Sequence, residues 1–188
     1  MIYNDNYDVK EAIVKKDLID RIIESGETAE KKQLKIKQDV ASLLQTPISY
    51  IASKEIYDIL LPIIKHVNVT KKWNFDLAEF EPLQFTTFKE GEYIGWDRHQ
   101  SAEPYSNGFI RKISFFITLE EPEEYDGGHF ALMIPKHVPK KQRVLDFETK
   151  YLPGSVICFP SFIPFRTFPV LKNQKRILFG WVTGPQYR

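Results

Sequence analysis

The segment Phe159-Pro160-Ser161-Phe162-Ile163-Pro164-Phe165-Arg166-Thr167-Phe168-Pro169-Val170 connects two short runs that are rich in apolar, aromatic and β-branched residues. The first run, Ser155–Phe159, and the second, Phe165–Val170, each have the length and composition of a β-strand. The prolines between them indicate a turn or loop. This stretch therefore predicts two strands of a β-rich domain.

The same pattern extends through the second half of the chain. From about residue 80 the apolar residues recur with a period of two, and turn residues separate the runs. Short strands at regular intervals, after a helical first part, indicate helices packed on an all-β barrel or jelly roll, an α+β fold. The other predicted strands are Leu83–Phe88, Tyr93–His99, Lys112–Leu119, His129–Ile134 and Arg176–Val182.

The first third of the chain has a helical pattern. After Asp8, apolar residues from Val9 to Ile23 lie near helical spacing, and we expect Gly26 to end this helix. The charged residues 27–37 carry little apolar pattern. They are predicted to form an exposed loop or an irregular helix end.

A second helix is predicted after Ser53, which is a plausible N-cap. Pro62 lies inside this helix, and its missing N–H and its ring should kink the helix or break it into two pieces. Further along, residues 135–150 are rich in lysine and arginine. We expect this segment to be a solvated loop, with a partner-binding lip as the alternative.

Composition restricts the class of protein. The 188 residues are 43% hydrophobic, enough for one well-buried core, and 26 basic against 25 acidic residues give a net charge of +1. This charge favours neither nucleic acid nor membrane as a partner. The single cysteine, Cys158, fits a reducing compartment, and no apolar run has the roughly 20 residues of a membrane helix. The start of the chain lacks the features of a secretory signal, so we expect a cytoplasmic protein.

Asp97 and His99 are the first candidate metal ligands. Alternate side chains of a strand point to the same face, so residues at i and i+2 can bind one ion together. Asp97 and His99 have this spacing, whereas Trp96 and Arg98 would face the other way. Non-haem iron sites use two histidines and one carboxylate. The same triplet also fits a surface ion pair or a histidine held by a local hydrogen bond.

Several ordered blocks together carry a resemblance to a known family. They resemble the prolyl-4-hydroxylase-type branch of the 2-oxoglutarate/Fe(II) oxygenases, and most of all the short forms found in tailed phages. The similarity covers the chain from roughly Asp17 to Pro185. The blocks are Pro82–Phe88, Gly91–His99, Arg111–Leu119, Glu121–Gly128, Pro153–Phe162, and Arg176 with the ending Gly180–Pro185.

The resemblance implies a double-stranded β-helix, which is a jelly-roll barrel, flanked by N-terminal helices. On this basis we expect residues 1–188 to form a single oxygenase-like domain. Residues 1–70 would be its helical support region, and residues 80–185 its jelly-roll core.

The chain departs from the family at the residues that would bind the metal. The family's Trp-His-x-Asp pattern is replaced by Trp96-Asp97-Arg98-His99, so the histidine and the carboxylate have changed places. The family's third ligand, a histidine that follows Phe-Pro-Ser, is replaced by Phe165. A phenyl ring cannot coordinate iron, so we expect Phe165 to be a hydrophobic plug and Asp97 and His99 to be vestigial ligands.

Arg176 is the residue that matches the family's cosubstrate site. It follows Phe165 by eleven residues, at the position whose guanidinium pairs with the far carboxylate of 2-oxoglutarate in the family. The forked guanidinium suits a carboxylate. Without the cosubstrate, Arg176 would instead form a structural salt bridge. The remaining histidines, His66, His129 and His137, do not have the spacing of metal ligands.

These departures favour a non-catalytic structural or binding protein on the oxygenase fold, with no catalytic residue and no cofactor expected. The resemblance to phage forms suggests protein partners and a role in a virion or its assembly. The alternative is an active hydroxylase that uses Fe(II), 2-oxoglutarate and an atypical metal site. A third option is a carboxylate pocket around Arg176 without iron.

Overall fold

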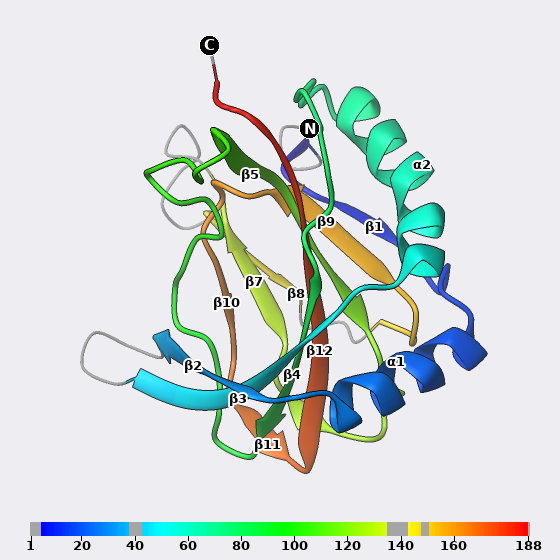
Figure 1. Ribbon diagram of the computed structural model, residues 1–188. Helices are drawn as coiled ribbons and strands as arrows, with labels where there is room; N and C mark the ends of the chain where they lie inside the picture. The colour runs from blue at the N-terminus through cyan, green and yellow to red at the C-terminus, as the bar shows by residue number, and fades with distance from the viewer. Residues whose placement is uncertain (1–4, 38–42, 135–142, 148–150, 188) are drawn as a thin grey trace.

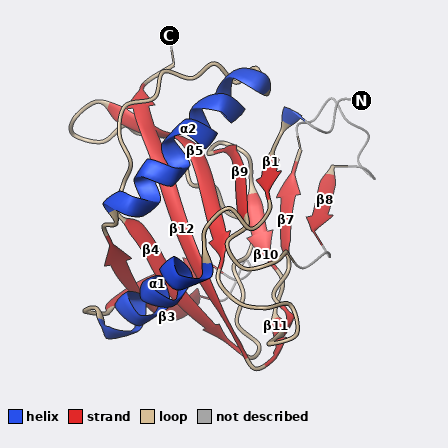
Figure 2. Ribbon diagram, turned by 90° about the vertical axis from the view of Figure 1, so that its right-hand side faces the viewer, coloured by secondary structure: helices blue, strands red, loops and turns tan. Residues whose placement is uncertain are grey.

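The computed structural model describes residues 5–37, 43–134, 143–147 and 151–187. Two helices lie on one face of a large antiparallel sheet, and smaller sheets lie on its other face (Figures 1 and 2). The barrel is enclosed between the large sheet and the smaller sheets. This architecture confirms the predicted jelly roll with flanking helices.

The helices are α1 (Lys16–Thr28) and α2 (Lys54–Thr70). Most strands lie in the second half of the chain, as the period of two predicted. The strands are β1 (Asp8–Lys10), β2 (Lys32–Lys37), β3 (Leu43–Ile51), β4 (Leu83–Lys89), β5 (Phe109–Thr118), β6 (Asp126–Gly127), β7 (Phe130–Met133), β8 (Val144–Phe147), β9 (Val156–Pro160), β10 (Phe165–Thr167), β11 (Val170–Lys172) and β12 (Gln174–Pro185).

The long strand β12 lies at the centre of the large sheet. The strand order in this sheet is β1-β9-β5-β12-β4-β3-β2, and each neighbouring pair is antiparallel. Phe179 of β12 lies opposite Phe116 of β5 on one side and Gln84 of β4 on the other. The smaller sheets have the orders β10-β7-β8 and β11-β6.

The large sheet separates two hydrophobic cores because successive side chains of a strand point to opposite faces. Leu178 and Val182 of β12 pack with the helices in the helix-side core. Phe179 and Trp181 point the other way, into the barrel core. Eight aromatic residues belong to the barrel core: Phe88, Phe116, Phe130, Phe147, Phe159, Phe165, Phe179 and Trp181.

The first helix is shorter than predicted. It begins at Lys16, because Asp8–Lys10 forms β1 and pairs with Cys158, Ile157 and Val156 of β9. Gly26 does not end the helix but lies within it. A Cβ at Gly26 would lie 2.3 Å from the ring of Phe85, so the missing side chain lets α1 pack closely against β4.

The second helix agrees with its predicted start. The Ser53 hydroxyl accepts a hydrogen bond from the N–H of Ile56 at 3.4 Å, as expected of an N-cap. Pro62 lies inside α2, but the helix runs unbroken from Lys54 to Thr70, so the predicted break is wrong. The apolar side chains of Ile56, Leu60 and Ile64 hold α2 on the large sheet.

Other predicted elements need correction. Residues 1–70 contribute β1, β2 and β3 to the large sheet as well as both helices, so this region is not purely helical. Residues 93–99 form no strand; Asp97 makes only an isolated bridge to Phe165. The predicted strand 165–170 is split into β10 and β11, since Pro169 lacks an N–H and cannot donate to a ladder.

The basic segment 135–150 lies partly outside the described residues. Where it is described, residues 144–147 form strand β8, which pairs with β7 rather than forming a loop. Neither helix of the described chain has the length and apolar character needed to span a membrane.

Candidate functional site

A cavity of about 250 Å³ adjoins the barrel core, and we call it the mouth cavity. It contains both predicted metal ligands together with the predicted plug. Its lining combines polar groups with aromatic rings from the barrel core. The lining residues are Tyr50, Gln84, Ile94, Asp97, Arg98, His99, Arg111, Phe165, Phe179 and Trp181.

Asp97 and Phe165 are held together by their backbones. The N–H of Asp97 donates to the carbonyl of Phe165 at 3.0 Å, and the N–H of Phe165 donates to the carbonyl of Asp97 at 2.9 Å. The Asp97 side chain is exposed, and its Oδ1 accepts a hydrogen bond from the N–H of Arg98 at 2.7 Å. The carboxylate is therefore turned toward its own loop.

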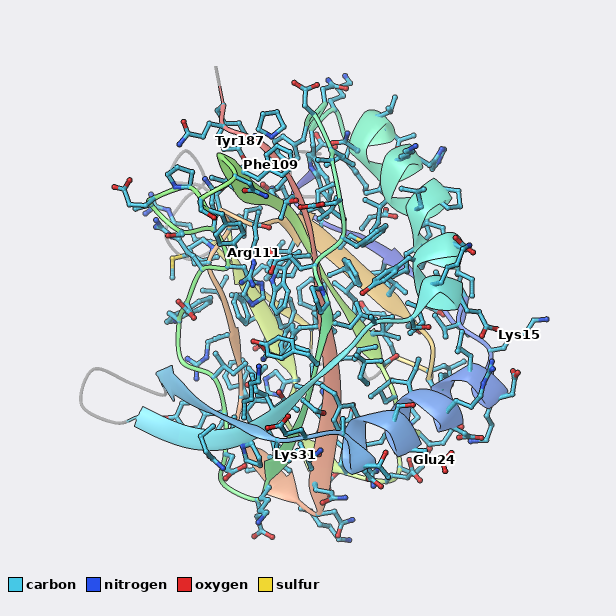
Figure 3. The ribbon with its side chains drawn as sticks, in the orientation of Figure 1. Lys15, Glu24, Lys31, Phe109, Arg111 and Tyr187 are labelled. Carbon is cyan, nitrogen blue, oxygen red and sulfur yellow. The ribbon has the colours of Figure 1, made fainter. Side chains whose placement is uncertain are left out.

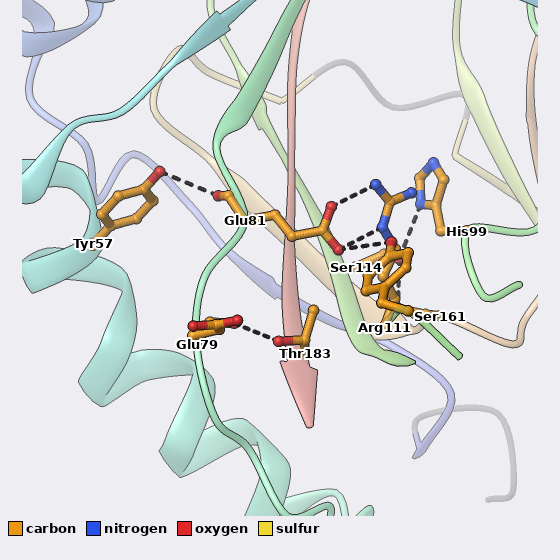
Figure 4. A network of polar contacts seen from close by, with 9 residues as sticks. Tyr57, Glu79, Glu81, His99, Arg111, Ser114, Ser161 and Thr183 are labelled. Atoms are coloured by element: carbon orange, nitrogen blue, oxygen red, sulfur yellow. Dashed lines mark hydrogen bonds and ion pairs between the residues drawn. The ribbon is translucent and has the colours of Figure 1, made fainter. Parts of the chain in front are cut away.

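His99 lies deeper, in an aromatic environment. Its Nδ1 is 2.9 Å from the Ser114 hydroxyl, which is in turn 2.8 Å from the Ser161 hydroxyl (Figure 4). The imidazole centroid lies 4.2 Å from that of Phe165 and 5.1 Å from that of Trp181. Burial, and then the positive charge of Arg111, lower the pKa of His99 well below its usual value. His99 is therefore neutral at neutral pH.

Phe165 is only 1% exposed and belongs to the barrel core. Its ring centroid lies about 6 Å from those of Phe130, Phe159 and Phe179. These separations are typical of favourable aromatic pairs. Phe165, which the sequence resemblance matches to the family's third ligand, thus packs inside the barrel beside His99.

The described residues do not supply a three-ligand iron site. Asp97 and His99 line the same cavity, but no cluster of three His, Cys, Asp or Glu side chains is found in the described chain. At the third position of the family pattern, the sequence resemblance predicts the hydrocarbon ring of Phe165. A site with two histidines and one carboxylate does not fit this donor set.

Arg111 is a cavity residue that the sequence did not reveal. Its guanidinium donates from Nε to Glu81 Oε1 at 2.8 Å and from an Nη to Oε2 at 2.6 Å (Figure 4). The same guanidinium lies 3.7 Å from the centroid of a Trp181 ring. Arg111 lies in the body of the molecule, away from the α1 residues at its edge (Figure 3). A β-bulge opposite Val182 and Thr183 shifts the alternation of β5, which no local sequence signal indicated.

Arg176 lies on the helix side of β12. One Nη pairs with Glu120 Oε1 at 2.9 Å, and the other pairs with Glu27 Oε1 of α1 at 2.7 Å. Burial would lower the pKa of Arg176, but the bonds and charges of these two carboxylates raise it above its usual value. The structure therefore places Arg176 in the salt bridge that was its alternative role, away from His99.

Lys175 precedes Arg176 on β12. Its side chain points to the same face of the strand as those of the barrel-core residues Ile177 and Phe179, because these residues alternate along β12. Its Nζ donates to the carbonyl of Gly128 at 2.7 Å and lies 4.7 Å from the centroid of the Tyr125 ring. Two cavities of about 20 Å³ adjoin it, each with room for about one water. The alternation of β12 thus turns Lys175, and not Arg176, toward the inside of the barrel.

His129 and His66, which the sequence analysis also considered, have other neighbours than His99. His129 Nε2 lies 3.2 Å from Asp146 Oδ1, and its ring stacks on Phe168 at 3.8 Å. His66 lies in α2, and its hydrogen-bonding contact in the structure is through its backbone carbonyl. His137 lies outside the described residues. None of the described histidines joins His99 in a metal cluster.

The sequence is similar to curated hydroxylases. It is 25% identical over 140 residues to a PKHD-type hydroxylase of Hyphomonas neptunium, covering 73% of this chain and 58% of that protein. A PKHD-type hydroxylase of Crocosphaera subtropica is 25% identical over 100 residues, 53% of this chain and 41% of that protein. The chain thus spans about half the length of the curated relatives it matches. No family model matches the sequence.

The fold is similar to those of solved prolyl hydroxylases. A prolyl-4-hydroxylase of Pseudomonas putida has a TM-score of 0.66 and 16% identity, over 94% of this chain and 92% of that one. The viral collagen prolyl hydroxylase of Paramecium Bursaria Chlorella virus-1 has a TM-score of 0.64 and 15% identity, over 95% and 96%. The chain therefore has the fold of the 2-oxoglutarate/Fe(II) oxygenases, and its sequence similarity to curated hydroxylases agrees with the resemblance found in its motifs.

The similarity to hydroxylases corrects one prediction. The expectation of a protein without cofactors is overturned by the hydroxylase relatives, because their family is one of Fe(II)- and 2-oxoglutarate-dependent enzymes. The relatives therefore point to these cofactors, while the described residues of this protein hold no cluster of three His, Cys, Asp or Glu side chains.

Proposed function

We propose that this protein recognises a ligand in the mouth cavity of its oxygenase fold. The single observation that carries the proposal is the arrangement around Phe165. Its ring is buried at the residue that the sequence resemblance matches to the third iron ligand, and a cavity of about 250 Å³ adjoins it. Polar and aromatic side chains together line the cavity, a combination typical of small-ligand sites.

Fragment screening by NMR tests this proposal. We expect bound fragments to shift the indole N–H signal of Trp181 and the imidazole signals of His99, because both residues line the cavity. Phe162 provides a matched comparison, since it is an exposed aromatic residue that does not line the cavity. Fragments that shift only residues outside the cavity would contradict the proposal.

A second candidate function is hydroxylation with an atypical metal site. The comparisons favour this reading, because the curated relatives are named as hydroxylases. Asp97 and His99 line one cavity, and Lys175 supplies a cation inside the barrel for a cosubstrate carboxylate. Protein partners and a role in a virion remain expectations from the sequence resemblance.

One assay separates the two candidates. The purified protein is supplied with Fe(II) and 2-oxoglutarate, and succinate formation and bound iron are measured. Recognition without turnover predicts no succinate from the natural protein. Succinate formation that is lost in His99→Ala would instead establish the hydroxylase. The variant carrying Asp97→His, His99→Asp and Phe165→His tests whether the barrel can hold the family's complete ligand set.

A further inference from the structure

The imidazole of His99 is bonded to two buried serines, Ser114 and Ser161, which we call the serine pair. Nδ1 of the ring lies 2.9 Å from the Ser114 hydroxyl, and this hydroxyl lies 2.8 Å from that of Ser161 (Figure 4). Both serines are 0% exposed, so water does not reach them. Within the described chain, neither hydroxyl has another hydrogen-bond partner. The protons of both hydroxyls must therefore find acceptors among these three groups.

Counting the protons gives the direction of each hydrogen bond. A hydroxyl donates one proton, and a neutral imidazole has a proton on only one ring nitrogen. If Ser161 donates to Ser114 and Ser114 donates to Nδ1, both hydroxyl protons are used and the ring proton is on Nε2. If Nδ1–H instead donates to Ser114, one serine proton has no acceptor. The cost of an unpaired buried donor favours the first arrangement by roughly 5–150-fold.

The surroundings of His99 favour a neutral ring. Four aromatic rings have centroids between 4.2 and 6.2 Å from that of the imidazole: those of Phe159, Phe165, Phe179 and Trp181. A doubly protonated imidazole would place a charge among these rings and leave a serine proton unpaired. Buried charges need a partner of opposite sign, and no carboxylate of the described residues pairs with His99. The lowered pKa of His99, caused by burial and then by Arg111, agrees with a neutral ring.

The backbone holds the ring in this position from both sides. The N–H of Gln100, the next residue, donates to the carbonyl of Ser161 at 3.0 Å. Nε2 points away from Ser114 (Figure 4), has no hydrogen bond within the described chain and is not among its buried polar atoms that lack a partner. This nitrogen is therefore open to the mouth cavity, which His99 lines.

We propose that the serine pair fixes the Nε2–H tautomer of His99, so that the mouth cavity presents a neutral hydrogen-bond donor. The ligand then has an acceptor, such as a carbonyl oxygen, that lies against Nε2. Ser114 is a positioning residue, because it touches His99 and not the ligand. The statement about the ligand rests on the proposed function, whereas the tautomer is a property of the free protein.

This role of His99 differs from metal binding. A metal-binding histidine uses the lone pair of one ring nitrogen and donates the other N–H to an acceptor. With Nε2 as the metal-binding nitrogen, Nδ1–H would donate to Ser114, and one serine proton would be unpaired. A hydroxylase that binds iron through His99 would therefore be favoured by the Nδ1–H tautomer, which is the opposite of the tautomer proposed here.

NMR of the natural protein with ¹⁵N-labelled histidine tests the tautomer directly. Long-range ¹H–¹⁵N spectra show which ring nitrogen carries the proton, and the signals of His99 are assigned by their absence from His99→Gln. We expect the ligand-free protein at neutral pH to carry the His99 proton on Nε2. A proton on Nδ1, or on both nitrogens, would overturn the proposal.

Two serine variants form a matched pair. Ser114→Ala removes the hydroxyl that donates to Nδ1, so we expect both tautomers of His99 to be populated. Ser161→Ala keeps this donor and should retain the Nε2–H tautomer. A purely structural role of Ser114 would leave the tautomer ratio unchanged in Ser114→Ala, and that result would overturn the role of the pair. Melting curves establish that both variants are folded, and the natural protein decides the tautomer if they are not.

Two small five-membered rings test the ligand class. N-Methylpyrrolidinone has a carbonyl acceptor and no N–H, whereas pyrrole has an N–H and no carbonyl. We expect N-methylpyrrolidinone to bind roughly 2–10-fold more tightly, because one net hydrogen bond contributes this much, and to shift the Nε2–H signal of His99. Equal binding, or a preference for pyrrole at His99, would overturn the acceptor assignment.

The outcomes separate this inference from the proposed function. If neither probe binds but other fragments shift the Trp181 indole, the acceptor assignment is overturned and the ligand-binding function stands. If nothing binds at the mouth cavity while the proton of His99 is on Nε2, the proposed function and its ligand are overturned and the tautomer stands.

Discussion

The two cores on either side of the large sheet are built from different side chains. Two of the eighteen buried residues of the helix-side core are aromatic, against eight of the fourteen in the barrel core. Branched aliphatic side chains interdigitate where α1 and α2 lie on the sheet. Large rigid rings fill the barrel with fewer residues and leave a cavity at its mouth. The two faces of one sheet therefore differ in the kind of side chain that buries them.

The largest expected effect tests the barrel core. Phe165→Ala removes a fully buried ring, so we expect a loss of about 3–5 kcal/mol in the free energy of unfolding. Chemical denaturation measures this loss. Phe162→Ala, three residues away but 43% exposed, is the matched control and should have a much smaller effect. Equal losses from the two variants would show that Phe165 is not a packed part of the core.

The next largest loss of stability is expected on the helix-side face of β12. Arg176→Ala leaves the Glu120 carboxylate, whose side chain is 5% exposed, without its cation, so we expect a loss of about 1–3 kcal/mol. Burial raises the pKa of Glu120, and removal of Arg176 should raise it further. The loss should therefore shrink as the pH falls and Glu120 becomes protonated. Denaturation curves at several pH values measure this; a loss independent of pH would contradict the pairing.

A smaller effect is expected at the start of α2. Ser53→Ala removes the side chain that accepts from the N–H of Ile56, and we expect a loss of about 0.5–2 kcal/mol. Ser53→Gly should lose less, since glycine is tolerated at an N-cap. Thermal or chemical denaturation measures both variants. No loss in Ser53→Ala would mean that packing of the apolar face alone holds the helix.

The last prediction changes reactivity rather than stability. Burial raises the pKa of Cys158 to about 12, so at pH 8 only about one thiol in 10,000 is ionised in the folded protein. A thiol reagent should label Cys158 only after unfolding, and raising the pH from 7 to 9 should leave the folded protein mostly unlabelled. Fast labelling of the native protein would show that the helix-side core opens readily.

The local sequence pattern predicts best the helices and strands whose buried residues recur with a simple period. β4, β9 and α2 were predicted within a few residues because their apolar residues recur regularly. The strand at Asp8–Lys10 was missed, since three residues carry no period and depend on pairing with distant β9. The predicted strand through Asp97 was wrong, because the only pairing of this segment is an isolated bridge between Asp97 and Phe165. Pairing with a distant residue is again what the local pattern could not predict.

The order of motifs along the chain was enough to predict the jelly roll and the similarity to hydroxylases, because residue identity is local information. The replacement of the third metal ligand by Phe165 stays a prediction from the same motifs. The tertiary structure decided which side chains share a space. It turned Arg176 toward Glu120 and Lys175 into the barrel, and it brought Arg111 over Trp181 through a bulge. One residue of register moves a side chain to the opposite face of a sheet, and only pairing with distant strands determines that register.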